Sequence, residues 1–139
     1  MPMDVPFEAE LAKLRSALAP MASCQAPYWL AGGWALDLFL GRMTRPHHDI
    51  DIAILRRDQA AVQRHLADWS LRWVEPRSGG RFHPWWYDEW LALPIHEIHG
   101  THRDGQTIEL LLNESKGETW YFRRDQRLQR HLHLHQRNK

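Results

Sequence analysis

The pair Asp104-Gly105, placed between two strand-like runs, is the feature of this sequence that most constrains its fold. The runs cover residues 95–102 and 107–112. Asp-Gly between two such runs is a strong signal for a β-hairpin closed by a two-residue loop. A loop of that length places Arg103 opposite Gln106 and Gly100 opposite Glu109. We therefore expect a β-sheet that contains this antiparallel pair.

Helix-like and strand-like patterns alternate before the hairpin. Apolar residues recur at steps of three and four from Phe7 to Leu18, which is the spacing of one helix face. Short apolar runs bounded by glycine or acidic residues are typical of strands. The expected elements are helix 7–18, strand 28–31, helix 34–40 closed by Gly41, strand 50–55, helix 58–69, strand 71–74 and strand 120–122, with an irregular, lid-like loop over 76–94. This order predicts an α/β (α+β) fold, a small mixed β-sheet with helices packed on it.

Length and charge narrow the class of protein. The chain has 139 residues and a formal net charge of +1 with neutral histidines. We expect one domain, residues 1–139, with a loosely ordered tail from about residue 124. The small net charge argues against nucleic-acid and membrane partners. No apolar run has membrane-spanning length, no signal peptide is visible, and the single cysteine excludes an internal disulfide. We expect a cytoplasmic protein.

Two carboxylates stand at the start of the strand expected over 50–55. Asp49 and Asp51 are two residues apart, so in a strand both side chains point to one face while Ile50 points to the other. Two adjacent carboxylates repel each other unless a cation lies between them. Mg²⁺ is commonly held by one or two carboxylates together with substrate phosphates. An isolated pair of this kind is more often simply solvated. Its surroundings therefore determine whether a metal site is the better interpretation.

The surroundings of this pair suit a phosphate. Gly32-Gly33 ends a strand just before a helix, where backbone N–H groups can cradle an anion. Arg42, Arg45 and His47 lie between this turn and the aspartates and could neutralise a triphosphate. The alternatives are an ordinary glycine turn and a solvated basic loop.

The order and spacing of these residues resemble a known family. The run Gly32-Gly33-Trp34-Ala35-Leu36-Asp37, followed by Gly41-Arg42-x-Thr44-Arg45-x-His47-x-Asp49-Ile50-Asp51, resembles the aminoglycoside and lincosamide nucleotidyltransferases of the polymerase-beta-like superfamily. The close resemblance covers about residues 28–55, and Trp120-Tyr121-Phe122-Arg123-Arg124 looks like a later element of these proteins.

The resemblance implies a nucleotidyltransferase fold and an activity. A nucleotidyl group, AMP from ATP, would pass to a hydroxyl of a small acceptor, with Mg²⁺ as cofactor. It also implies which residues act. The catalytic and metal-binding residues would be Asp49, Asp51 and Glu109, and the nucleotide-binding residues would be Gly32, Gly33, Trp34, Arg42, Thr44, Arg45 and His47.

Glu109 is the candidate for the third carboxylate that the resemblance implies on a later strand. The expected hairpin register places a glycine, Gly100, opposite Glu109, which would leave room for a ligand. The face of Glu109 would then carry His96, Ile98, Gly100, His102, Thr107, Leu111 and Asn113. The alternative is a structural pair between Glu109 and His102.

Other clusters in the sequence are weaker evidence for a functional site. His96-Glu97-Ile98-His99 lacks the spacing of a zinc-binding helix, and in a strand its two histidines face opposite ways. His131, His133 and His135 are expected to belong to a loosely ordered tail. The aromatic residues between Phe82 and Trp90 would be core, a homodimer contact or a wall for the substrate. A non-catalytic nucleotide-binding module, such as an antitoxin-like partner of another protein, is the alternative to an enzyme.

Overall fold

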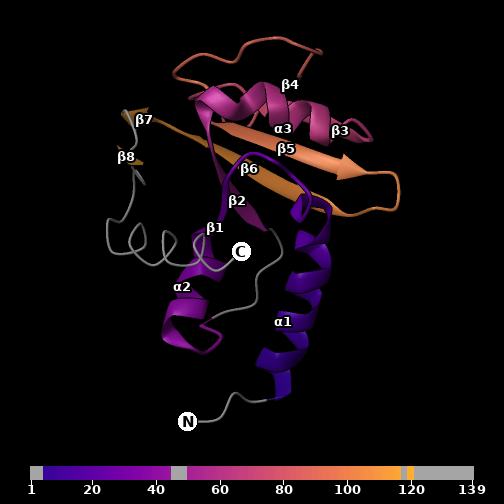
Figure 1. Cartoon of the computed structure of the whole chain (residues 1–139), viewed down its shortest axis with the longest axis vertical. Coiled ribbons are helices and arrows are strands. Elements are labelled where there is room, and N and C mark those ends of the chain that lie inside the picture. Colours follow the sequence, from indigo (N-terminus) through magenta and orange to yellow (C-terminus); the bar gives the residue numbers. More distant parts are fainter. Residues whose placement is uncertain (1–4, 45–49, 117–118, 121–139) are drawn as a thin grey trace.

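A six-stranded mixed sheet organises the molecule (Figure 1). The structure, a computed structural model, describes residues 5–44, 50–116 and 119–120, with side chains described over 7–44 and 50–114. The strands are β1 (Tyr28–Ala31), β2 (Asp51–Leu55), β3 (Trp69–Val74), β4 (Phe82–Pro84), β5 (Glu97–His102) and β6 (Thr107–Asn113). Their order is β1-β2-β6-β5-β3-β4. Among these strands β2 and β6 run parallel, and the other neighbours are antiparallel.

Over the described ranges, three α-helices accompany the sheet, as the sequence predicts. They are α1 (Val5–Leu18), α2 (Gly32–Leu40) and α3 (Gln59–His65), and a short pair, β7 (Ser115–Lys116) and β8 (Thr119–Trp120), follows β6. Gly41 ends α2 in the left-handed conformation, with φ of 74°. The expected helix over 58–69 is too long, because α3 ends at His65 and Trp69 already begins β3. In the described part of the chain, no helix has the length and apolar character needed to cross a bilayer.

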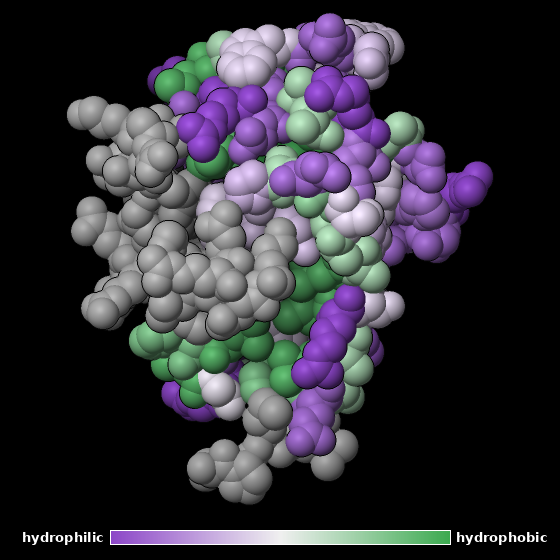
Figure 2. Space-filling model, in the orientation of Figure 1, coloured by the Kyte–Doolittle hydropathy of each residue, from purple (hydrophilic) through white to green (hydrophobic). Residues whose placement is uncertain are grey.

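The two faces of the sheet are packed differently. On one face, branched side chains of β2, β5 and β6 form the main core with Val62 of α3 and with Leu66, which follows this helix. On the other face, Ala35 of α2 packs with Trp29 and Ala31 of β1 and with Ala53 and Leu55 of β2. Trp34 extends from α2 to Phe7, Leu11 and Leu14 of α1, which joins the two helices. Hydrophobic residues gather over α2 in the lower half of Figure 2, where Leu36, Phe39 and Leu40 are exposed.

The hairpin forms where expected, but its register is shifted by one residue. His99, and not Gly100, lies opposite Glu109, and Gly100 lies opposite Ile108. The connecting loop has three residues, because the His102 N–H donates to the Gln106 carbonyl and Gly105 adopts a φ of 93°. The Asp104 carboxylate accepts the Gln106 N–H at 2.9 Å and stabilises this longer loop. That hydrogen bond and the neighbouring His102 ring lower the pKa of Asp104.

The shifted register overturns two expectations. Because strand side chains alternate, a slip of one residue exchanges the two faces. Gly100 therefore faces the core, where an added Cβ would lie 3.0 Å from Leu71 Cδ2, and it leaves no room beside Glu109. The alternative pairing of Glu109 with His102 is also wrong, since His102 lies on the opposite face of β5 from His99.

The segment 76–94 is more ordered than an irregular lid. It contains β4, and its later part is fixed to α3 by buried glutamines. Gln59 accepts the Leu91 N–H at 2.7 Å and donates to the Leu91 carbonyl at 3.1 Å. Gln63 donates to the Trp86 carbonyl at 2.9 Å and accepts the Asp88 N–H at 3.0 Å. These bonds hold the segment as part of the folded unit.

The double hydrogen bond of Gln59 yields a prediction about stability. Gln59→Leu keeps the side-chain size but leaves the buried N–H of Leu91 without this acceptor, which should cost about 1–3 kcal/mol. Urea unfolding measures the loss. As a control, Gln106→Leu removes a more exposed amide that donates to Ala17, and should cost less. Equal losses for the two variants would contradict the anchoring role of Gln59.

Candidate carboxylate site

Asp51 and Glu109 lie side by side on the sheet. Asp51 is the first residue of β2, and in the parallel pairing with β6 its partner is Glu109. Their side chains share the face on which α2 packs, because Ala53 and Leu55 alternate with Asp51 toward that helix. The sheet thus places two of the three predicted carboxylates together. Asp49 lies outside the described residues.

Gly32 lies directly against Asp51, one member of this pair. It begins α2 with a φ of 64°, and a Cβ added there would lie 2.1 Å from Asp51 Oδ2. A glycine is therefore required both by the backbone and by the close approach of the carboxylate. Asp51 Oδ1 is buried and has no hydrogen-bond partner among the described residues. A buried carboxylate oxygen without a donor is suited to a cation, so Asp51 and Glu109 fit a divalent metal.

Two further residues join the site from β5. His99 Nε2 lies 2.5 Å from Glu97 Oε2 and 3.4 Å from Glu109 Oε1. The side chains of Glu97, His99 and Glu109 are 31%, 26% and 21% exposed, so solvent reaches all three. The sequence prediction missed Glu97 and His99 in this place. Their alternation along the strand could have revealed them, but only with the correct hairpin register.

The structure describes five of the seven predicted nucleotide-binding residues. Gly32 and Gly33 form the first residues of α2, beside Asp51. Arg42 is exposed just after the same helix, and Trp34 is 3% exposed, in the core against α1. Thr44 binds Asp37 through its hydroxyl, at 2.6 Å, and its N–H, at 3.1 Å, so it fixes the segment after α2. The other two, Arg45 and His47, lie outside the described residues.

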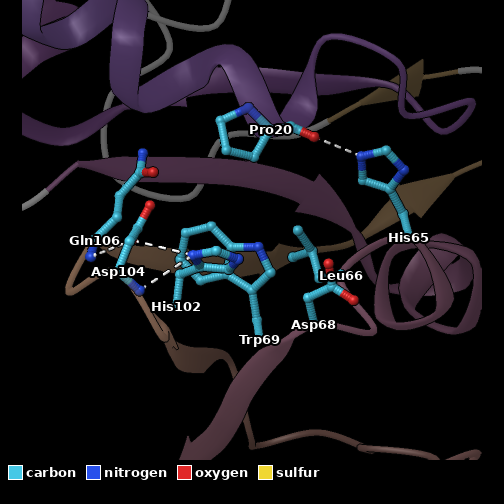
Figure 3. Close-up of a pocket in the computed structure, with 8 residues that line it drawn as sticks. All are labelled: Pro20, His65, Leu66, Asp68, Trp69, His102, Asp104 and Gln106. Atoms are coloured by element: carbon cyan, nitrogen blue, oxygen red, sulfur yellow. Dashed lines mark hydrogen bonds and ion pairs between the residues drawn. The ribbon is translucent and has the colours of Figure 1, made fainter.

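A separate pocket of about 270 Å³ opens on the other face of the sheet (Figure 3). Its lining residues come from the segment after α1, the end of α3, the start of β3, and the end of β5 with the loop that follows, and they include His65, Asp68, Trp69 and His102. His65 Nε2 is 2.6 Å from the Pro20 carbonyl, and the ring of His102 lies 5.2 Å from that of Trp69. None of the predicted site residues that the structure describes lines this pocket.

The arrangement of strands and helices is that of a nucleotidyltransferase fold. The chain superposes on the crystal structure of ANT(2'')-Ia in complex with adenylyl-2''-tobramycin, with a TM-score of 0.52 and 19% identity over 84% of this chain and 56% of that one. At that identity the likeness establishes the fold. A sequence profile of the aminoglycoside-2''-adenylyltransferase family matches residues 13–136, so the chain belongs to that family and the resemblance seen in its motifs is confirmed.

Two relatives are similar in sequence to this chain over shorter stretches. A 2''-aminoglycoside nucleotidyltransferase of Escherichia coli is 46% identical over 39 residues, which are 28% of this chain and 22% of that protein. A lincosamide resistance protein of Staphylococcus haemolyticus is 32% identical over 76 residues, which are 52% of this chain and 44% of that protein. The chain thus matches less than half the length of these relatives.

The contact between Gly32 and Asp51 can be tested with a matched pair of glycines. Gly32→Ala and Gly41→Ala both place a side chain at positive φ, which costs about 1–2 kcal/mol. No described residue lies within 4 Å of an added Cβ at Gly41, whereas at Gly32 it would also crowd Asp51 Cγ (3.0 Å) and Cβ (3.2 Å). Gly32→Ala should therefore be less stable by about a further 1–3 kcal/mol in urea unfolding. Equal stabilities would contradict the close packing of Gly32 on Asp51.

Proposed function

We propose that this protein transfers a nucleotidyl group, AMP from ATP, to a hydroxyl of a small acceptor. The observation that carries the proposal is the pairing of Asp51 with Glu109 against Gly32, with Asp51 Oδ1 buried and without a hydrogen bond from the part of the chain that the structure describes. Membership of the aminoglycoside-2''-adenylyltransferase family supports it independently. The acceptor class follows from the relatives, whose names give aminoglycosides and lincosamides. The reaction would take place in the cytoplasm.

The residues have distinct proposed roles. Asp49, Asp51 and Glu109 would hold Mg²⁺, which when bound neutralises and orients the triphosphate. The backbone of Gly32 and Gly33, at the start of α2, would bind phosphate oxygens. Further phosphate contacts would come from the remaining predicted residues, Arg42, Thr44, Arg45 and His47. Trp34 would act from the core, by fixing α2 against α1.

Positioning would supply most of the catalysis. The acceptor hydroxyl attacks the α-phosphorus in line, pyrophosphate leaves, and the hydroxyl proton passes to a base. Glu109, partly exposed beside Asp51, would either complete the metal site or accept that proton. A glutamate is one methylene longer than an aspartate, so its carboxylate can extend farther from the strand into the site.

Magnesium-dependent nucleotide binding tests the proposal. ATP at a hundred times its dissociation constant should stabilise the protein by about 2.7 kcal/mol, and only when Mg²⁺ is present. Asp51→Asn should abolish this thermal shift and leave the fold intact, because it removes a charge and keeps the shape. Asp68→Asn is the control, since Asp68 lines the pocket on the other face of the sheet.

Two results would count against the proposal. If Asp51→Asn binds Mg-ATP as tightly as the parent protein, the metal assignment is wrong. If Mg-ATP binds but no hydroxylated acceptor in an aminoglycoside and lincosamide panel yields pyrophosphate, the chain is a non-catalytic nucleotide-binding module.

We also propose that the working unit is a homodimer with the acceptor cleft near the subunit boundary. Trp85 is buried, whereas Trp86, Tyr87 and Trp90 are 67%, 75% and 57% exposed. The hydrogen bonds from Gln59 and Gln63 hold these aromatic side chains outward on a fixed loop. Large exposed aromatic groups on an ordered segment are typical of interfaces.

Light scattering at micromolar concentration tests the dimer. The parent protein should have twice the monomer mass, and the double variant Trp86→Ala, Tyr87→Ala should be monomeric. Phe39→Ala is the control, because Phe39 is 55% exposed on α2, away from this loop. A monomeric parent protein would contradict this part of the proposal.

A further inference from the structure

We propose that Glu97, His99 and Glu109 form a second cation site, which takes a divalent transition metal of the zinc class. The site lies beside the position proposed for Mg²⁺ and shares Glu109 with it. The ligand set follows from the chain's own geometry, and only its role next to a nucleotide rests on the proposed function.

The three side chains converge because of the hairpin register. His99 lies directly opposite Glu109, and Glu97 is two residues back along β5, so all three point to the same face. One ligand atom from each residue lies within 4.8 Å of the other two. Two antiparallel strands hold the cluster, and strands position ligands more rigidly than loops do.

One ring nitrogen stands between two carboxylates. His99 Nε2 is close to Glu97 Oε2, at 2.5 Å, and to Glu109 Oε1, at 3.4 Å. A single N–H cannot serve both oxygens fully, whereas a metal ion in place of that proton can bind the nitrogen and both carboxylates. Zinc lies about 2.0–2.2 Å from such atoms, so its ligands are separated by about 3.3–3.5 Å. Glu109 is already at that distance from Nε2, and Glu97 would need to move back by about 1 Å.

The donor set selects the kind of metal. Mg²⁺ prefers oxygen ligands, whereas an imidazole nitrogen suits zinc and its transition-metal neighbours. One histidine and two carboxylates leave a coordination position for water or a substrate oxygen. The cluster is therefore suited to a cation different from the one expected at Asp51.

The surroundings favour binding by fixing the His99 ring. Phe82 holds that ring edge-on, with centroids 4.8 Å apart, and a fixed ring orientation favours ligation. Arg72, the residue opposite His99 on β3, places its guanidinium over the Phe82 ring, 4.4 Å from the centroid, which fixes Phe82 in turn, while its positive charge opposes a cation nearby. A separate observation comes from the next strand, where Asp51, the partner of Glu109, has a buried Oδ1 without a hydrogen bond to any described residue. Carboxylates suited to a cation thus lie on both sides of Glu109, from Asp51 on β2 and from Glu97 on β5.

Zinc and cobalt binding test the site. The full chain carries His131, His133 and His135, which could bind zinc themselves, so the parent protein for the test has all three replaced by glutamine. After treatment with a chelator, it should bind one Zn²⁺, measured by competition with a chromophoric chelator. Co²⁺ should give the visible absorption bands of a low-symmetry site with nitrogen and oxygen ligands.

Substitutions locate the bound ion. His99→Gln and Glu97→Gln should each weaken Zn²⁺ binding by more than about 10- to 100-fold, the range for losing only a supporting group of a metal ligand. His96→Gln is the matched control, because His96 precedes β5 and its Nδ1 lies 3.1 Å from the Pro94 carbonyl, outside the cluster. Circular dichroism verifies that each variant is folded.

Several results would overturn the site. These are a parent protein that binds no zinc, a His99→Gln variant that binds it as tightly as the parent, and equal losses for His96→Gln and His99→Gln. Asp51→Asn separates this proposal from the function above. It should lose the Mg-ATP shift and keep the zinc site, and the loss of both would show that a single cation site serves the whole face.

Discussion

The parallel pairing of β2 with β6 is the constraint on which the rest of the site depends. It sets Asp51 beside Glu109 and, on the opposite face, Ile52 beside Leu110 and Ile54 beside Leu112. Those branched side chains are fully buried under α3, so a slip of one residue would bring carboxylates into the core. Hydrophobic packing on one face of the sheet therefore fixes the spacing of charged groups on the other.

Rigid neighbours complete this arrangement. Gly32 lets α2 begin directly against Asp51, where any side chain would collide with the carboxylate. Trp34 then fixes α2 to α1, and the Asp37–Thr44 hydrogen bonds fix the segment that leaves α2. On the far side of the sheet Gln59 and Gln63 hold the aromatic segment. The carboxylates thus stand among elements whose positions are set by buried contacts, as a positioning mechanism requires.

Local patterns in the sequence predicted most of the elements and the family. They failed where contacts between distant residues, or hydrogen bonds of side chains, determine the local structure. Helix and strand periodicity located α1, β1 and α2, and the spacing from Gly32 to Asp51 identified the nucleotidyltransferase family. The hairpin register was wrong because the Asp104 side chain stabilises a three-residue loop that the Asp-Gly pair alone does not reveal. That one-residue error hid the placement of His99 and Glu97 beside Glu109. The order of the segment around Leu91 depends on Gln59, 32 residues away, which no local pattern contains.

The most direct test of the account is a crystal structure with Mn²⁺, used in place of Mg²⁺, and a non-hydrolysable ATP analogue. The anomalous signal of manganese locates the ion without ambiguity. The account predicts an ion bound to the triphosphate and to oxygens of Asp51 and Glu109, at about 2.0–2.3 Å, with the phosphates against the start of α2. An ion bound to the phosphates while both carboxylates point away from it would contradict the central claim that β2 and β6 together build the metal site.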